Sequence, residues 1–152
     1  MTVNELTRHL ALEQVEYEVI PHARTLTARD EAFEIGLIEV GKTVVLATER
    51  GFLRAVVPAA ERLDLHKVRV LTGSRTLRLA SEEELAGAYP MFELGAVPPF
   101  GGPTGDRTIV DRRLAHHESM VLEAGTHEES IRLRTRDLIR LTDARIEDIC
   151  ED

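Results

Sequence analysis

A short apolar run from Thr43 to Ala47 constrains the fold of this chain more than any other stretch. Its residues are β-branched or apolar, and Gly41 and Gly51 bound it. Such a run between turn residues is typical of a strand that is buried on both faces. A second run, Phe52–Val57, follows after one short turn, so the sequence predicts a β-hairpin that Pro58 closes.

A lysine opens the first of these strands. Side chains alternate along a strand, so Lys42 is expected to point the same way as Val44 and Leu46, toward an apolar interior. Of the 19 Lys and Arg residues of the chain, only Lys42 and Lys67 are lysines, so a compact ammonium stands where this chain otherwise uses arginine. Two interpretations stay open: Lys42 is functional, or its stem passes the core edge and its head is solvated.

Residues 36–43 match the phosphate-loop pattern G-x-x-x-x-G-K-[ST] letter for letter. That motif requires a strand before it and a helix after it, so that backbone N–H groups converge on phosphate. Here a capping box at Thr27–Asp30 predicts a helix over Ala28–Ile35, and a strand follows Lys42. Because the context is reversed, we reject a nucleoside-triphosphate site.

Length and charge bound the class of protein. The 152 residues are expected to form one domain, residues 1–152, and the net charge of −8 excludes a global basic field for nucleic acid or anionic membrane. The single cysteine, Cys150, can form no internal disulfide, which favours a reducing compartment. The sequence has no leader and no apolar run of transmembrane length, so we expect a soluble, cytoplasmic protein without a membrane partner.

Helices and strands alternate along the remaining chain. The first helix is expected to carry Leu6, Leu10 and Leu12 on one side. Further strands are predicted at Tyr17–Ile20, Arg75–Ala80, Arg107–Asp111, Met120–Glu123 and Ser130–Leu133. Further helices are predicted after the caps Asp64, Ser81 and Thr135, and over Ala144–Cys150. Several connections are typical of hairpins, so the predicted fold class is α+β, built on a mixed sheet flanked by helices.

The stretch Leu94–Gly105 is rich in turn residues, since seven of its twelve residues are Gly or Pro. Gly95 and Ala96 lack bulk, so backbone N–H groups there can approach a ligand, and Pro98 and Pro99 restrict the loop. Fixed N–H donors of this kind resemble an oxyanion-binding site. The alternative is a long surface connection.

The histidines do not indicate a metal site. His116 and His117 are consecutive, so their side chains point apart, and neither a cysteine partner nor an H-E-x-x-H spacing is present. We interpret the pair as solvated surface and expect no metal and no cofactor. No G-x-S-x-G elbow indicates a serine nucleophile. His22, in a loop between a strand and a helix, is of more interest, and the role of His127 stays open.

Taken together, these stretches resemble the aminoacyl-tRNA deacylases of the YbaK and prolyl-tRNA editing-domain family along nearly the whole chain. The resemblance is carried by the loop at His22, the helix before Lys42-Thr43, the G-x-x-x-P loop Gly95–Pro99 with Phe100-Gly101, Thr108–Asp111, and the Gly125 turn that leads to Ile131–Leu133. It implies an editing-domain-like fold with a partly barrel-like sheet. It also implies hydrolysis of the ester that joins a wrong amino acid to tRNA, in many members prolyl-tRNA.

The family resemblance also implies roles for individual residues. Lys42 and Gly95 would be catalytic, with Lys42 holding the terminal phosphate or ribose as a point charge while water attacks the ester. The expected partners are the tRNA acceptor end and a prolyl-tRNA synthetase, and the oligomeric state is not predicted. The substrate-binding residues would be His22, Thr43, Ala96, Val97, Pro98, Pro99, Phe100, Gly101, Gly125, Thr126 and Ser130.

Two positions depart from the family pattern, which leaves the amino acid removed open. Many relatives have a second glycine where this chain has Ala96, and an acidic residue is sometimes found at Ser130. The Ala96 methyl and the Phe100 ring are expected to narrow the pocket, which favours a small amino acid. The alternative function is a non-catalytic module that binds a tRNA end or a small ligand, and the presence of Lys42 favours the enzyme.

Overall fold

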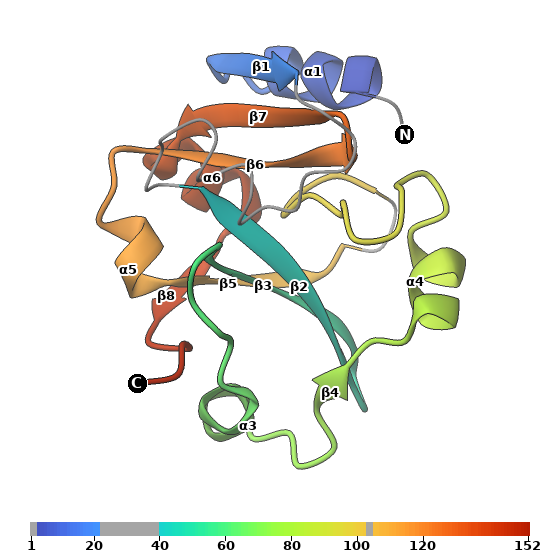
Figure 1. The fold of residues 1–152 in the computed structure, drawn as a ribbon, viewed down its shortest axis with the longest axis vertical. Coiled ribbons are helices and arrows are strands. Elements are labelled where there is room, and N and C mark those ends of the chain that lie inside the picture. Colours follow the sequence, from blue (N-terminus) through green and yellow to red (C-terminus); the bar gives the residue numbers. More distant parts are fainter. Residues whose placement is uncertain (1–2, 22–39, 103–104) are drawn as a thin grey trace.

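The computed structural model describes residues 3–21, 40–102 and 105–152, arranged as two β-sheets with flanking helices (Figure 1). A three-stranded antiparallel sheet has the order β1-β7-β6, and a five-stranded mixed sheet has the order β4-β2-β3-β5-β8. The strands are β1 (Tyr17–Pro21), β2 (Gly41–Thr48), β3 (Gly51–Pro58), β4 (Arg78–Leu79), β5 (Arg107–Asp111), β6 (Ser119–Thr126), β7 (Glu129–Arg134) and β8 (Arg145–Glu147). The predicted α+β class is confirmed, and the two sheets do not close into a barrel.

The predicted hairpin is confirmed as β2 and β3, which pair antiparallel from Gly41↔Pro58 to Thr48↔Gly51. β5 then lies parallel to β3, and β8 lies parallel to β5, which makes the sheet mixed. The hairpin therefore forms the centre of the five-stranded sheet, as expected of a strand that is apolar on both faces.

The helices are α1 (Val3–Leu12), α3 (Leu65–Thr72), α4 (Glu82–Ala88), α5 (Arg112–Ala115) and α6 (Thr135–Thr142). The caps predicted at Asp64 and Ser81 are confirmed, whereas the cap predicted at Thr135 is wrong: Thr135 is the first residue of α6, and the cap is Arg134, which makes no side-chain cap hydrogen bond. The Asp64 carboxylate accepts the backbone N–H groups of the first turn of α3, and Ser81 forms a complete capping box with Glu84 at the start of α4. No helix within the described ranges has the length and apolarity that a membrane crossing requires.

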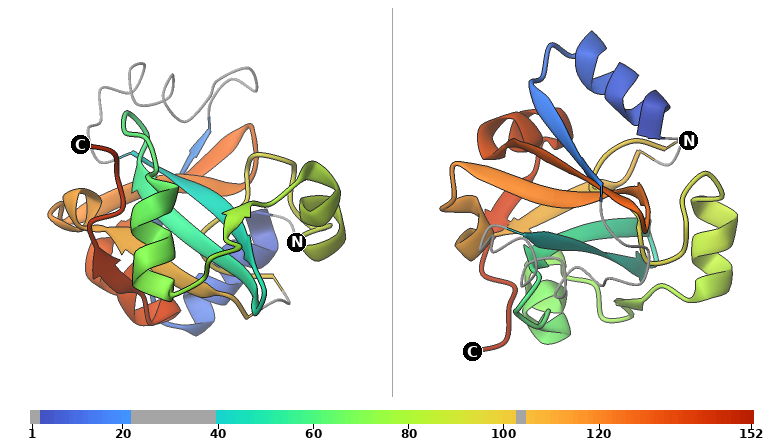
Figure 2. Two further views of the ribbon diagram at one scale, coloured as in Figure 1. Left: turned by 90° about the horizontal axis from the view of Figure 1, so that it is seen from below. Right: turned by 45° about the horizontal axis from the view of Figure 1, so that its top comes forward.

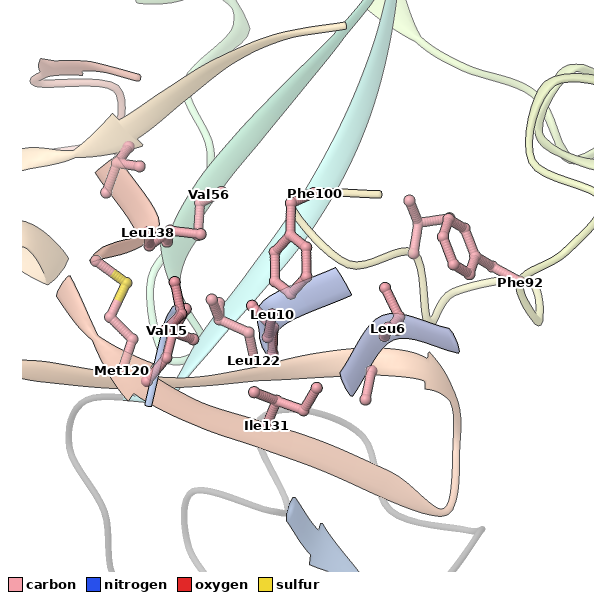
Figure 3. Packing of buried hydrophobic residues seen from close by; sticks show 14 of the residues in the cluster. Leu6, Leu10, Val15, Val56, Phe92, Phe100, Met120, Leu122, Ile131 and Leu138 are labelled. Atoms are coloured by element: carbon pink, nitrogen blue, oxygen red, sulfur yellow. The ribbon is translucent and has the colours of Figure 1, made fainter. Parts of the chain in front are cut away.

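Two apolar clusters lie on opposite faces of the five-stranded sheet. The main cluster fills the space between the two sheets and is joined by Leu6 and Leu10 of α1 (Figure 3). The second cluster lies under α3, which packs on the outer face of β2 and β3 through Val68 (Figure 2). The buried side chains of β2 therefore divide between the two clusters, with Val45 in the main cluster and Leu46 in the second.

Several expectations from the sequence are wrong. The segment Ala144–Cys150 is not a helix, because residues Arg145–Glu147 form β8. Leu12 does not join Leu6 and Leu10, since 77% of its surface is exposed at the end of α1. The strand expected over Arg75–Ala80 is reduced to Arg78–Leu79. The helix expected over Ala28–Ile35 lies outside the described residues.

Candidate functional site

The edge of β6 that faces away from β7 brings two of the predicted site segments together. Val40, immediately before β2, forms a parallel bridge with Val121. Farther along β6, the Gly125 carbonyl accepts the N–H of Glu93 at 2.8 Å, and the Gly125 N–H donates to the Ala96 carbonyl at 3.0 Å. The start of β2 is therefore bridged to the edge of β6 to which the loop that begins at Gly95, called here the glycine-proline loop, is hydrogen-bonded.

Lys42 lies on the side of β6 that carries Glu123. Paired residues of a parallel bridge face the same side, and side chains repeat every second residue, so Lys42 follows Val40 on that side as Glu123 follows Val121. Lys42 is partly buried, and its side chain has no ion pair or hydrogen bond with another described residue. The sequence prediction that Lys42 shares its strand face with Val44 and Leu46 agrees with the register of β2.

Glu123 is a residue that the sequence analysis did not single out. Glu123 is only 8% exposed although it carries a carboxylate. Its register partner on β7 is Ser130, which is wholly buried. The signal was present in the sequence, because Glu123 interrupts the apolar run from Met120 to Ala124. Lys42 faces the same side as Glu123 and Ser130 of the three-stranded sheet, so an ammonium, a carboxylate and a hydroxyl lie on one side of the junction between β2 and β6.

Thr43 faces the opposite way from Lys42, toward the main cluster. Its hydroxyl oxygen is buried and has no hydrogen-bond partner among the described residues. Gly41 faces the same way, and a Cβ added to it would stand 2.7 Å from Cδ2 of Leu114 and 2.9 Å from Cδ2 of Leu122. The glycine of the phosphate-loop-like pattern thus has a packing role, and the side chains of Lys42 and Thr43 do not meet.

The glycine-proline loop, which follows α4, begins with an exposed glycine whose backbone lies in the left-handed region. Gly95 has φ +82°, a conformation that L side chains rarely adopt. The N–H of Ala96 donates to the Glu93 carbonyl at 3.0 Å and closes a turn. This N–H is therefore not available to a ligand, contrary to the expectation from the sequence. The N–H groups of Gly95 and Val97 have no acceptor within the described part of the chain. These two groups are the candidate donors of the loop.

Gly125 holds the loop close to β6. It has φ +93°, and a Cβ added to it would stand 2.8 Å from Cδ1 of Phe92. Any side chain at this position would therefore displace Phe92 and the loop that is bonded to β6. Thr126, the last residue of β6, is partly buried beside it.

His127 lies at the exposed end of this arrangement. Its backbone N–H donates to a carboxylate oxygen of Glu93 at 3.3 Å, and its Nε2 is hydrogen-bonded to the Leu94 carbonyl. A Cβ added to Gly95 would stand 3.3 Å from Cε1 of His127. The structure therefore places His127 over Gly95, whereas His22 lies outside the described residues.

A buried arginine, which the sequence analysis also missed, holds the other end of the loop. Arg54 of β3 is 3% exposed and donates from Nη1 to the Pro98 carbonyl at 2.9 Å, from Nη2 to the Gly101 carbonyl at 2.7 Å, and from Nε to Asp106 at 3.2 Å. Its guanidinium carbon lies 4.9 Å from the centroid of the Tyr89 ring. Burial raises the pKa of Asp106, an effect that the charge of Arg54 opposes.

The remaining predicted loop residues are buried. The side chains of Val97 and Phe100 belong to the main cluster, in which Figure 3 labels Phe100. Ala96, Pro98 and Pro99 are also buried. These side chains face the core in this structure, and the expected narrowing of an aminoacyl pocket by Ala96 and Phe100 stays a prediction.

The described residues contain no group of three His, Cys, Asp or Glu side chains that could hold a metal ion. His116 is exposed, as expected, and His117 is partly buried. Cys150 is buried in the second cluster, and burial raises the pKa of its thiol to about 12. A thiol with such a pKa is a poor nucleophile near neutral pH.

Comparison with known proteins gives a family match over most of the chain. The profile of the aminoacyl-tRNA editing domain matches residues 20–141. A solved structure described as that of a candidate trans-editing enzyme for prolyl tRNA synthetase is 28% identical, with a TM-score of 0.86, and the match covers 99% of this chain and 97% of that one. A scaffold protein from computational epitope-backbone grafting is 26% identical, with the same TM-score and the same coverage.

One further relative, a curated protein, matches this chain over only a small part of the relative's own length. The proline–tRNA ligase of Thermosipho africanus (strain TCF52B) is 25% identical over 115 residues, which are 74% of this chain. The match spans 20% of the length of that ligase.

Proposed function

This chain belongs to the aminoacyl-tRNA editing domain family, and from that premise we propose that it hydrolyses the ester bond of mischarged aminoacyl-tRNA in trans. The activity is assigned to residues 1–152 as one domain, acting in the cytoplasm on the acceptor end of the tRNA. The observation that carries the proposal is the meeting of two segments on one edge of β6. Val40, two residues before Lys42, is bridged to Val121, and the loop that begins with Gly95 is hydrogen-bonded to Gly125.

The chemistry of ester hydrolysis suits this pair of segments. Attack on the ester carbonyl builds negative charge on its oxygen, and fixed N–H donors stabilise that charge without reorganisation. The donors proposed are the N–H groups of Gly95 and Val97. Lys42 supplies a compact positive charge, which holds the terminal phosphate or ribose of the tRNA in place.

Water is the proposed nucleophile, oriented by the loop and by the ribose hydroxyl of the substrate. The thiol of Cys150 is not proposed as the nucleophile, because it is buried in the second cluster, on the outer face of the five-stranded sheet. No covalent acyl-enzyme is expected, so intact-mass spectrometry during turnover should find only the unmodified chain. A trapped acyl adduct would contradict direct attack by water.

The substrate proposed is tRNA-Pro that carries a small amino acid such as alanine or serine. Two comparisons support it: the similarity to a candidate trans-editing enzyme for prolyl tRNA synthetase and the similarity to part of a proline–tRNA ligase. A prolyl-tRNA synthetase is the proposed partner. A difference of one methylene changes recognition by only about 1–3 kcal/mol, so the preference among small amino acids should be graded.

The test is a deacylation panel with purified protein and tRNAs charged with Ala, Cys, Ser and Pro. We expect turnover of a small aminoacyl ester on tRNA-Pro at a rate well above spontaneous hydrolysis. Binding without turnover of any charged tRNA would instead support the alternative function, a non-catalytic module that holds a tRNA end or a small ligand.

A further inference from the structure

The residue Val97 lies between two anchored carbonyl groups. On its N-terminal side the Ala96 carbonyl accepts the N–H of Gly125 at 3.0 Å. On its C-terminal side the Pro98 carbonyl accepts Nη1 of Arg54 at 2.9 Å. The Val97 N–H lies in the same planar peptide unit as the Ala96 carbonyl, so the bond from Gly125 on β6 sets its direction, and the bond from Arg54 on β3 holds the chain at the next peptide unit but one.

Arg54 is suited to this task because its guanidinium is a planar fork with donors in fixed directions. Two of its nitrogens reach the carbonyls of Pro98 and Gly101, and the third is occupied by Asp106. The ring of Tyr89 lies against the guanidinium carbon. The two carbonyls flank Pro99 and Phe100, so Arg54 sets the span of this part of the loop from the protein interior.

We propose that Arg54 is a positioning residue for ester hydrolysis, which acts by holding in place the loop segment that carries the Val97 N–H donor. The inference rests on the proposed deacylase function. A lysine at position 54 would keep the positive charge beside Asp106, but its single ammonium could not hold two carbonyls and a carboxylate in one plane. The charge and the geometry of Arg54 can therefore be separated by substitution.

The first experiment compares Arg54→Lys with Val68→Ala. Val68 lies in the second cluster, on the other face of the sheet and away from the loop, so Val68→Ala is a control for lost stability alone. At a temperature well below both melting points, Arg54→Lys should lower kcat by about tenfold to a hundredfold with little change in KM, the size of loss that a small misplacement of catalytic groups causes. Val68→Ala should keep the wild-type kcat.

Hydrogen exchange of the loop tests the same idea without any substrate. Peptides that cover residues 94–102 should exchange faster in Arg54→Lys than in the wild type and in Val68→Ala. Unchanged exchange of this loop in Arg54→Lys would overturn the proposal even if the protein proved to have no deacylase activity. If exchange rises but wild-type protein hydrolyses no aminoacyl-tRNA, the proposed function fails, and with it the catalytic role of Arg54.

A second variant covers the case in which Arg54→Lys does not fold. Asp106→Asn removes the charge that faces Arg54 but leaves an oxygen that can accept from Nε, and it does not touch the bonds to the two loop carbonyls. We expect a lower melting temperature, unchanged exchange of residues 94–102 and a kcat near that of the wild type. A kcat that falls as far as the hundredfold range in Asp106→Asn would show that the ion pair, and not the loop carbonyls, governs activity, and would overturn the proposal.

Discussion

The imidazole of His127 lies beside the space that a side chain at Gly95 would need: a Cβ added to Gly95 would stand 3.3 Å from Cε1 and 3.7 Å from Nε2 of the ring. The same ring is hydrogen-bonded to the carbonyl of Leu94. The backbone of Gly95 is therefore enclosed on the side of His127 and, at φ +82°, adopts a conformation that favours glycine.

Gly95→Val should abolish deacylation while leaving the protein folded. The new side chain must displace His127 or change φ, and either change moves the proposed N–H donors, for which a loss of about 10²–10³ in kcat is typical of a single lost donor. Single-turnover hydrolysis of aminoacyl-tRNA measures the effect. Gly73→Val is the matched control, because Gly73 has φ +71° but nothing within 4 Å of its added Cβ. Wild-type rates in Gly95→Val would exclude the loop from catalysis.

Lys42→Ala should remove deacylation of every competent substrate and retain a folded protein. The reason is the loss of the positive charge proposed to hold the tRNA end, while the partly buried stem contributes little to the core. Lys67→Ala is the control, since Lys67 is the other lysine of the chain and binds Asp148 and Asp152 near the C-terminus. It should lose stability and keep activity. Near-full activity of Lys42→Ala would make Lys42 a solvated strand-end residue.

Glu49 should stabilise the protein at neutral pH and lose this effect at acid pH. The hydroxyls of Ser74 and Thr76 donate to one carboxylate oxygen of Glu49 at 2.7 and 2.6 Å, and these bonds lower the pKa of Glu49 from 4.5 to about 2. A carboxyl whose pKa is depressed by folding stabilises the protein above the unfolded pKa, and this contribution is lost as pH falls through the folded pKa.

Glu49→Gln should therefore lower the melting temperature at pH 7, and the difference from the wild type should shrink between about pH 4.5 and 2. Thermal unfolding at pH 7, 5 and 3 is the measurement. Glu82→Gln, at an exposed glutamate in the first turn of α4, is the control. A difference that stays constant over this pH range would show that the Glu49 carboxylate contributes nothing as an ion.

Bare tRNA should bind weakly. At a net charge of −8 the chain has no overall attraction for a polyanion, so contact should be confined to the acceptor end and the affinity should lie in the range of about 10⁻⁴–10⁻⁶ M typical of non-specific binding. Fluorescence anisotropy at two salt concentrations measures affinity and salt dependence. An acceptor-stem minihelix should bind as well as the whole tRNA. Submicromolar affinity at physiological salt, or a steep salt slope, would contradict this.

The local elements of the fold could be predicted because their signals are short-range. The hairpin of β2 and β3 follows from two apolar runs around one turn, and the caps Asp64 and Ser81 follow from side chains that bond the next turn. β8 could not be predicted in this way. Its strand conformation depends on pairing with β5, for example Val110↔Ile146, and the spacing of Ile146 and Ile149 fits a helix equally well.

The candidate site could be predicted only where its residues stand out in composition. A rare lysine and a loop rich in glycine and proline are visible in the sequence, and the structure brings the start of β2 and this loop to one edge of β6. Arg54 was missed because a cation in a strand usually faces water and because two of its partners are backbone carbonyls, which carry no sequence signal. Glu123 was missed because its burial depends on which strands flank β6.

The chain visits the two sheets alternately: β1 belongs to the three-stranded sheet, β2 to β5 belong to the other, β6 and β7 return to the first, and β8 completes the second. Tyr17 pairs with Leu133, and Ile109 pairs with Arg145. No single cut between elements separates one complete sheet from the other. Folding must therefore wait for contacts between distant parts of the chain, which slows it. Opening of either sheet also disrupts strands that lie next to Val40 and Val121, so the candidate site should be lost in the same cooperative step as the fold itself.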